Sequence, residues 1–312
     1  MKNATLRQLR VFESAARHLS LTRAAEELHL TPPAVSIQIR QLEGHARAPL
    51  FERIGRGLKL TQAGEEVLSH ARGILGHIRA SEEAIAGLAS LEQGLLDVAV
   101  INAGDYFLPW LIAAFRERHP RIRARITVGN RDLLLERLAA HEIDLAVMSH
   151  APTQPAFAAR PFAPHPHVIV AAPGHALAKR RSVTLEAVAH EPIISREPGS
   201  ATRLAMDQAF SESGVVPRIE MEIASNETIK QAVAAGFGLG FLSGHAVQQE
   251  LALGRLAVVP VKGFPFMRQW YVVHRRSRTL PRIAEAFERF VVEEGARHIQ
   301  GPRSAVTRGR RR

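Results

Sequence analysis

Residues 20–64 carry the pattern that most limits how this chain can fold. The segment can be parsed as a helix, a tight turn, a second helix and a basic hairpin. Ala24 and Ala25 are small enough to let a second helix cross closely. Apolar residues at helical spacing could seal a small core between the helices; they are Leu21, Leu28, Leu30, Val35, Ile39 and Leu42. We therefore expect a folded helix-turn-helix, a device for reading DNA.

The second of these helices has its own start signals. Thr31 can cap it through its hydroxyl, and Pro32 or Pro33 suits a first turn in which no N–H is needed. Side chains on its exposed face can hydrogen-bond base edges and phosphates; they are Ser36, Gln38, Arg40 and Gln41.

A basic hairpin is expected after the two helices. Residues 50–53 and 58–60 read as short strands joined by a turn that contains Gly55 and Gly57. The turn can hold Arg56 beside a groove, and with Arg53 and Lys59 it resembles the wing of a winged helix. The alternative is an ordinary exposed hairpin with solvated arginines.

Positive charge is concentrated at the two ends of the chain. The net charge is +11; residues 1–64 hold ten Lys or Arg against five Asp or Glu, and residues 301–312 hold five Arg and no acid. The rest is therefore nearly neutral at +1. Charge placed on the helix-turn-helix favours a nucleic-acid partner over a merely soluble basic surface. We expect residues 297–312 to be a disordered basic tail.

Composition excludes several classes of protein. The chain has 312 residues, 46% of them hydrophobic, which suffices for roughly two or three domains with real cores. There is no cysteine, so neither a disulfide framework nor a thiolate metal site can form, as suits a reducing compartment. The start reads as an amphipathic helix rather than a signal peptide, and no apolar run approaches the roughly 20 residues that span a bilayer. The sequence predicts a cytoplasmic protein with no membrane partner.

A long helix is expected from about residue 62 to 91, capped by Thr61. Its apolar positions alternate four and three apart with one polar interruption; they are Val67, Ala71, Ile74, Ile78, Ser81, Ile85 and Leu88. Such a seam favours a dimer, because an isolated helix of this length needs a partner. The alternative is packing against its own domain. We assign 1–61 to a winged helix-turn-helix domain and 62–93 to a dimerising linker helix.

From residue 94 to 296 the pattern becomes α/β, with buried strands alternating with amphipathic helices. Strands are expected at 96–101, 124–128, 144–148, 168–172, 192–194, 220–223, 240–242, 256–260 and 270–274, and helices at 109–118, 131–141, 185–189, 201–213, 226–235 and 281–295. This alternation implies mainly parallel sheets covered by helices. Roughly 200 residues can form two such lobes, and we expect lobe I at about 94–163 and 267–296 and lobe II at about 164–266.

Two loops that follow strands have the chemistry of a binding site. One is 102–105; the other is 195–203, which combines the backbone N–H groups of a helix N-terminus with hydroxyls and two arginines, Arg196 and Arg203. That combination suits a phosphate or carboxylate. Alternatively, Ser200 or Thr202 simply caps the helix and the arginines pair with neighbouring acids. A third segment, 225–230, reads as a capped helix start.

The whole chain resembles a LysR-type transcriptional regulator. The motifs are TRAAEELHLTPPAVSIQIRQLE, then APLFERIGRGLKLTQAG, then a long helix and two lobes similar to periplasmic solute-binding proteins. Within the family, REPGSATR, SNETIKQAVAAGFGLGFLS and GFPFMRQWYVVH look most like the CbbR group, the regulators of Calvin cycle carbon-fixation operons.

The resemblance implies a homotetramer, a dimer of dimers, that binds an interrupted palindrome of double-stranded DNA near a promoter and alters recruitment of RNA polymerase. Residues 94–296 would be its effector-binding domain, and a metabolite bound between the two lobes would rearrange the DNA-binding domains. No cofactor is implied; the effector of CbbR-like members is a phosphorylated metabolite such as ribulose 1,5-bisphosphate, or NADPH. A LysR-type regulator of another operon, responding to a carboxylate, is the alternative.

Carried over position by position, the resemblance assigns two sets of residues. Those expected to contact DNA are Thr22, Arg23, Pro33, Ser36, Gln38, Arg40, Arg53, Arg56 and Lys59. Those expected to contact the effector are Asn102, Ala103, Gly104, Asp105, Asn130, Arg131, Arg196, Glu197, Gly199, Ser200, Thr202, Arg203 and Asn226.

Other functions find little support in the sequence. Gly-x-Ser-x-Gly, His-Glu-x-x-His and a Walker phosphate loop are all missing, so no enzyme activity is expected. His150, His165 and His167 could be considered for a metal, but scattered solvated histidines are the favoured interpretation and no metal site is expected. A free solute-binding component would fit residues 95–295 alone, but not the attached DNA reader.

Overall fold

The computed structural model describes residues 3–54, 57–87 and 94–299. Arg56, the expected end of the linker helix and the basic tail from residue 300 lie outside the described residues. Two compact units make up the chain. Among the described helices, none combines the length and apolar character needed to cross a membrane.

The N-terminal unit begins with three short helices, α1 (Leu6–His18), α2 (Leu21–Glu27) and α3 (Pro32–Ala46). The expected cap of α3 is confirmed, because the Thr31 hydroxyl accepts from the Ala34 N–H at 3.4 Å and Pro lies in the first turn. The expected helix crossing is confirmed as well. Ala24 and Ala25 are buried against Val35 and Ile39 in one core cluster.

A second core cluster joins α1 and α3 to the elements that follow. The hairpin strands β1 (Phe51–Ile54) and β2 (Gly57–Leu60) pair antiparallel as expected, and α4 (Gln62–Gly87) comes next. Phe12, fully buried, meets Phe51 edge to face with 5.4 Å between ring centroids. Ala71 of α4 is buried in this cluster, whereas Ile74 is 44% exposed. The first turns of α4 therefore pack on their own domain, and self-association along the later turns stays a prediction.

A hydrogen-bonded ion cluster ties α1 to α2. The Glu27 carboxylate accepts from Arg17 Nη2 at 2.6 Å and from Ser14 Oγ at 3.0 Å, and it pairs with His18 Nε2 at 2.6 Å. The Arg17 hydrogen bond is the main cause that lowers the pKa of Glu27, from 4.5 to about 2.

Acid should therefore destabilise this unit through Glu27. A carboxyl whose pKa is lowered by folding stabilises the fold fully above its unfolded value, and loses that contribution as pH falls from 4.5 toward 2. Because the Glu27 side chain is 39% exposed, we expect a loss of only about 0.5–1 kcal/mol. Urea unfolding of wild type and Glu27→Gln at stepped pH measures it. The curves should converge in acid, whereas exposed Glu26→Gln should track wild type; parallel Glu27→Gln and wild-type curves would contradict the assignment.

The second unit is built on one mixed sheet of nine described strands. Along the sheet the order is β4-β3-β5-β11-β6-β9-β7-β8, with β10 paired to β6. The strands are β3 (Gly94–Ile101), β4 (Ile122–Gly129), β5 (Leu145–Met148), β6 (Phe157–Ala171), β7 (Ile193–Arg196), β8 (Ile219–Ile223), β9 (Leu239–Ser243), β10 (Ala257–Val258) and β11 (Phe266–Arg275). Pairs β3–β4, β3–β5, β7–β8 and β7–β9 are parallel, whereas β6 and β11 run antiparallel to their neighbours.

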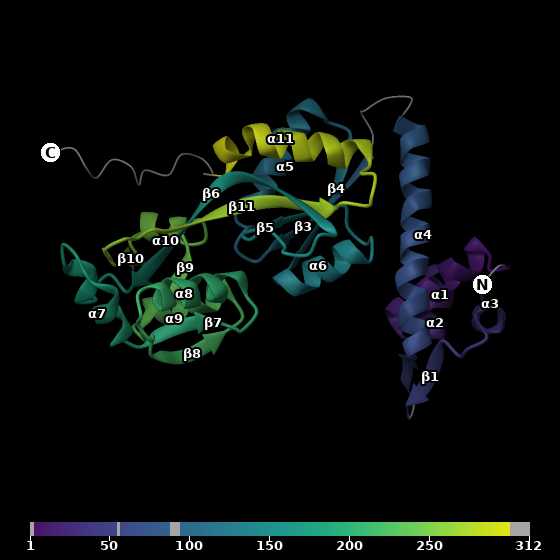
Figure 1. Cartoon of the computed structure of the whole chain (residues 1–312), viewed down its shortest axis with the longest axis horizontal. Helices are drawn as coiled ribbons and strands as arrows, with labels where there is room; N and C mark the ends of the chain where they lie inside the picture. Colours follow the sequence, from purple (N-terminus) through teal and green to yellow (C-terminus); the bar gives the residue numbers. More distant parts are fainter. Residues whose placement is uncertain (1–2, 55–56, 88–93, 300–312) are drawn as a thin grey trace. The chain divides into compact units, whose positions relative to one another are not determined.

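Helices cover this sheet at both ends. In Figure 1, α5 and α11 lie together over the strands of lobe I, and α8 and α9 lie with β7 and β8 in lobe II. The helices are α5 (Leu108–Arg118), α6 (Arg131–Ala139), α7 (Leu185–Ala189), α8 (Ala201–Glu212), α9 (Asn226–Ala234), α10 (Gln248–Ala252) and α11 (Arg282–His298), with a short 3-10 helix at Leu177–Lys179. All six expected helices are present; α10 and the 3-10 turn were not expected, and α11 runs past its expected end at Gly295 into the segment expected to be disordered.

Strand β6 begins earlier than expected. The sequence predicted a strand from Val168, yet β6 begins at Phe157 and runs through Pro161, Pro164 and Pro166. Proline is tolerated in a strand where its nitrogen faces away from the ladder or lies at an irregularity, and the β6–β11 register shifts between Trp270 and Tyr271. Two long paired strands therefore make the crossing.

Each lobe has its own core, and β6 and β11 contribute to both. Phe162 of β6 and Trp270 of β11 belong to the lobe I core. Ile169 of β6 belongs to a lobe II core, against which Phe266 of β11 packs. Loops at the ends of the flanking strands are thereby brought to the junction between the lobes.

Candidate DNA interface and effector site

The outward face of α3 is the first candidate surface. Arg40 and Ile37 are exposed, Ser36 and Gln38 are half-buried, and Arg40 Nη2 donates to Ser36 Oγ at 3.3 Å. Gln41 is different: its Oε1 accepts from Gln8 Nε2 at 3.1 Å, so this amide is engaged with α1. Gln41 remains exposed, so its contact with bases stays a prediction.

The other expected DNA contacts surround α3 within the same unit. Thr22 and Arg23 are exposed in the first turn of α2, and Pro33 is exposed in the first turn of α3. Arg53 and Lys59 are exposed on the two strands of the hairpin. Each is accessible to a phosphate backbone, which is what positioning contacts require.

Arg196 is the central group of the candidate effector site. It ends β7, and its side chain is 3% exposed. Its guanidinium donates to both carboxylate oxygens of Glu197, at 2.7 and 2.9 Å, and Nη1 donates to Asn226 Oδ1 at 2.8 Å. A buried guanidinium that meets a carboxylate with two parallel N–H groups has the geometry that recognises planar or tetrahedral oxyanions.

Asn102 and Asn226 connect this group to lobe I. Asn226 Nδ2 donates to the Asn102 backbone oxygen at 3.3 Å. With the Asn102 amide turned to suit its neighbours, its side-chain oxygen accepts from Arg196 Nη2 at 3.0 Å and its nitrogen donates to the Gly129 carbonyl at 2.9 Å. Residues from both expected loops are thus joined in one hydrogen-bond network.

The N-terminus of α8 lies beside Arg196. Ser200 caps it, accepting from the Arg203 N–H at 3.0 Å, and Thr202 is buried in its first turn. Gly199 adopts φ +84°, a left-handed conformation that favours glycine, and a Cβ there would lie 3.9 Å from Asp132 Oδ2 of lobe I. Arg203 forms ion pairs with Asp207 at 2.9 Å and Glu222 at 2.7 Å. For this arginine the structure therefore agrees with the alternative, in which it pairs with neighbouring acids.

The remaining expected residues of lobe I have mixed surroundings. Asn130 caps α6 by accepting from the Leu133 N–H at 2.9 Å, and Arg131 pairs with Asp132 at 3.3 Å. Ala103 and Gly104 are buried, and Gly104 lies so close to Val100 and Trp270 that a Cβ would have no room. Asp105 is exposed as a residue, but partial desolvation of its carboxyl, followed by the charge of Glu227, raises its pKa to about 6.

A second link between the lobes was missed by the sequence interpretation. Tyr106 Oη donates to Glu227 Oε1 at 2.6 Å, and burial followed by this bond raises the pKa of the tyrosine. Lys230, buried at 3% exposed, pairs with Glu227 at 2.7 Å and Glu250 at 2.9 Å, and its ammonium lies 4.9 Å from the Tyr106 ring centroid. In the sequence, only the spacing of Glu227 and Lys230, three residues apart at a helix start, indicated part of this contact.

Family models match both parts of the chain. The model described as a bacterial regulatory helix-turn-helix protein of the lysR family matches residues 6–65, and the LysR substrate binding domain matches residues 89–296. The chain belongs to the LysR family. It is a DNA-binding transcriptional regulator and not an enzyme.

Individual relatives of this LysR regulator span nearly its whole length. It is 45% identical over 295 residues to a RuBisCO operon transcriptional regulator of Allochromatium vinosum, covering 95% of this chain and 98% of the relative. It is 43% identical to the regulator CbbR of Rhodospirillum rubrum, over 92% and 95% of the two chains. The CcmR regulatory domain of Synechocystis PCC6803, solved in complex with 2-PG, is 34% identical with a TM-score of 0.61, over 64% of this chain and 96% of that one.

The histidine interpretation is wrong for two of the three residues. His165 and His167 of this regulator are fully buried rather than solvated, because β6 carries them through the junction between the lobes. His150 is half-buried, and burial followed by the charge of Arg268 lowers its pKa to about 4. No metal-binding group of three or more His, Cys, Asp or Glu occurs among the described residues.

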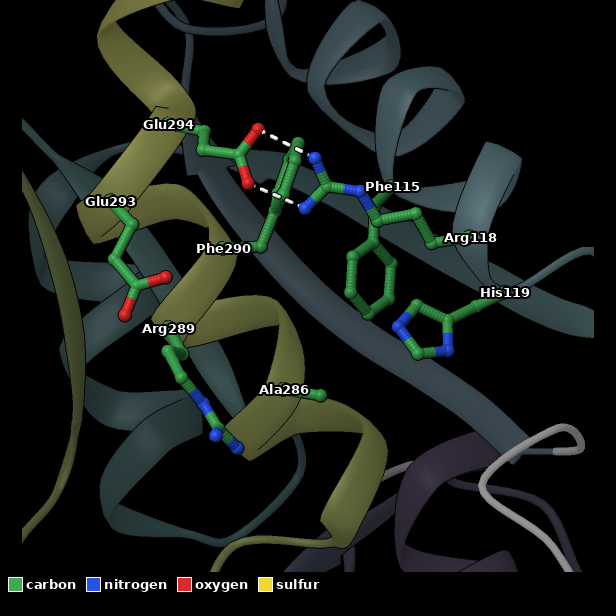
Figure 2. A pocket seen from close by; sticks show the side chains of 8 residues that line it. All are labelled: Phe115, Arg118, His119, Ala286, Arg289, Phe290, Glu293 and Glu294. Carbon is green, nitrogen blue, oxygen red and sulfur yellow. Dashed lines mark hydrogen bonds and ion pairs between the residues drawn. The ribbon is translucent and has the colours of Figure 1, made fainter.

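A surface pocket of about 250 Å³ lies elsewhere, on lobe I between α5 and α11 (Figure 2). Arg118 closes one side by donating to both carboxylate oxygens of Glu294, at 2.5 and 2.8 Å, above the ring of Phe290. None of the expected effector residues lines it. The Arg196 network, our candidate effector site, is therefore separate from this pocket.

Proposed function

We propose that this LysR regulator controls carbon-fixation genes in response to a phosphorylated metabolite bound by the Arg196 network. Identity of 45% to a RuBisCO operon regulator, over nearly all of both chains, carries the assignment of the regulated genes. The solved relative that binds 2-PG supports a phosphorylated effector. The N-terminus of α8 supplies N–H donors for such a group, and the buried Arg196 guanidinium beside it would supply charge by exchanging its Glu197 partner for the phosphate.

On the DNA side, we propose that the protein acts as a dimer of dimers on an interrupted palindrome, with α4 as the pairing helix. α3 would enter the major groove, with Ser36, Gln38 and Arg40 toward bases, while Arg23, Arg53 and Lys59 hold phosphates. Effector binding would change how the DNA-binding domains are arranged, and with them the recruitment of RNA polymerase. Genome-wide mapping of bound DNA tests the target assignment; sites away from carbon-fixation genes would overturn it.

Arg196→Ala should weaken binding of 2-phosphoglycolate by roughly 10- to 100-fold, because charge-assisted hydrogen bonds contribute about 1.5–3 kcal/mol. Affinity for the palindrome without ligand should change little, since Arg196 and the DNA-binding residues lie in different units. Isothermal calorimetry and DNA titration measure the two quantities.

Two controls sharpen this test. Arg218→Ala removes a guanidinium that is 61% exposed and should leave both affinities unchanged. Glycolate, which lacks the phosphate, separates the carboxylate alternative: if it binds as tightly as 2-phosphoglycolate, the effector is a carboxylate and the phosphate assignment fails. Equal affinity of wild type and Arg196→Ala for 2-phosphoglycolate would remove Arg196 from the site.

A further inference from the structure

Three imidazoles and an indole are buried together where the two lobes meet. His165 and His167 lie on β6, Trp270 on β11, and His245 follows β9; the first three are fully buried and His245 is 9% exposed. His165 stacks on Trp270 with 4.0 Å between ring centroids, and it lies 4.1 Å from His167 and 5.9 Å from His245. We call these four residues the junction cluster.

Most polar atoms of the junction cluster have no partner among the described residues. His165 Nε2 shares a hydrogen bond with Ser243 Oγ at 2.9 Å, but His165 Nδ1, both nitrogens of His167, both nitrogens of His245 and Trp270 Nε1 make none. The Phe266 carbonyl near His167 and the Pro164 carbonyl near His245 favour the protonated form of each imidazole. Neither contact meets the distance and angle of a hydrogen bond. Each buried unsatisfied group costs about 1–3 kcal/mol, so these nitrogens call for a polar partner other than the described side chains.

Arg268 is the permanent cation that acts on the junction cluster. Burial, then the neighbouring imidazoles and the Arg268 guanidinium, lower the pKa of His165 well below 6.5. Burial, His150, Arg268 and His245 lower that of His167 to about 3. The imidazoles are therefore neutral near neutral pH, and each offers one N–H donor, as does the indole. Unpaired N–H donors near the Arg268 guanidinium, with little solvent to compete, favour an anion.

The junction cluster also adjoins the proposed effector site. Trp270 packs beside Gly104 of the 102–105 loop, and Phe107 meets both His245 and Trp270 edge to face. Lys230 Nζ donates at 3.1 Å to the carbonyl of Ala246, the residue after His245. One network of packed groups therefore leads from the cluster to the loops that hold Arg196.

We propose that the junction cluster receives a second anionic group of the effector, so that this regulator selects metabolites carrying two separated anionic groups. This inference rests on the proposed effector site at Arg196. An anion at the junction favours the charged form of the adjacent imidazoles, so its binding is coupled to uptake of a proton from solvent. Affinity should consequently rise as pH falls toward the range in which the liganded imidazoles titrate.

Calorimetry in buffers of different ionisation enthalpy tests the coupling with full-length protein. 2-Phosphoglycolate carries a phosphate and a carboxylate, and inorganic phosphate is the probe with one group. Wild type should take up protons with 2-phosphoglycolate and not with phosphate. His167→Gln and His245→Gln should lose that uptake and bind 2-phosphoglycolate roughly tenfold or more weakly, whereas His190→Gln, at an exposed position, should match wild type.

Trp270 supplies a readout that leaves the junction cluster intact. Trp110 is 53% exposed, so Trp110→Phe makes Trp270 the sole tryptophan of a chain that has two. A protonated imidazole quenches a stacked indole more strongly than a neutral one, so 2-phosphoglycolate should quench Trp270 emission in this variant. Quenching should grow as pH falls, and adding His165→Gln should abolish it.

The outcomes separate the two proposals. If 2-phosphoglycolate binds in an Arg196-dependent way, without proton uptake and with unchanged affinity in both histidine variants, the junction cluster is no part of the site and the proposed function stands. If wild type does not bind 2-phosphoglycolate, both fail. If His167→Gln does not fold, His245→Gln and the Trp270 emission decide.

Discussion

Duplex binding by the intact protein is expected to weaken about 10³- to 10⁵-fold between roughly 50 and 200 mM salt. Each DNA-binding domain exposes Arg23, Arg40, Arg53 and Lys59 and carries Arg56 between the hairpin strands of its sequence, and a pair has twice as many of these cations. Each phosphate that such a cation neutralises releases condensed counterions, so log affinity falls linearly with log salt with a slope of about −0.9 per neutralised phosphate. Fluorescence anisotropy of a labelled palindrome across a salt series gives the slope directly.

The contribution of the hairpin to this salt dependence can be measured in the same assay. Arg53→Ala with Lys59→Ala should make the slope shallower by about 0.9 for every phosphate that the variant no longer neutralises, and weaken all sequences alike, because binding to the DNA backbone carries no base information. Arg180→Ala, an exposed cation of the second unit, is the matched control and should leave the slope unchanged. A flat salt response of wild type would rule out the phosphate contacts altogether.

Phe12→Ala is expected to destabilise the N-terminal unit by about 3–5 kcal/mol. Phe12 is fully buried, packs on Phe51 and belongs to the core cluster that joins α1, α3 and the start of α4. A loss of that size is a large fraction of the roughly 5–15 kcal/mol that holds a domain folded. DNA binding should therefore disappear near physiological temperature.

Urea unfolding followed by circular dichroism measures the loss, and tryptophan emission, from Trp110 and Trp270, reports separately on the second unit. The second unit should unfold at the same denaturant concentration in variant and wild type. Ile37→Ala, at a position 48% exposed on α3, should change unfolding by at most about 0.5 kcal/mol. A Phe12→Ala variant as stable as Ile37→Ala would show that this cluster is not the core of the unit.

Local chemistry explains which features the sequence could predict. The Thr31 cap and the proline turn of α3 depend on neighbouring residues only, and both are present. Strands and helices of the second unit follow from short-range hydrophobic patterns, and most were found close to their expected bounds. Arg196, Ser200 and Asn226 could be named because strand-to-helix loops gather at one edge of a parallel sheet.

Long-range pairing explains what was missed. The start of β6 depends on its pairing with β11, a strand far along the chain, which compensates for three prolines. Tyr106 meets Glu227 only because the lobes face each other, and nothing near either residue in the sequence announces the bond. Burial of His165 and His167 is likewise a property of the assembled junction, so the composition of the surrounding segment suggested solvated side chains.

The place of β11 in the sheet has a consequence for synthesis of the chain. β5 pairs only with β3 and β11 in the described sheet, and Phe287 of α11 is fully buried in the lobe I core. A nascent polypeptide emerging from the ribosome can complete its N-terminal unit early, but lobe I keeps an open strand edge and an uncovered apolar face until the last helix is translated. Premature termination before residue 282 would therefore release a product prone to aggregate, rather than a regulator that merely lacks its tail.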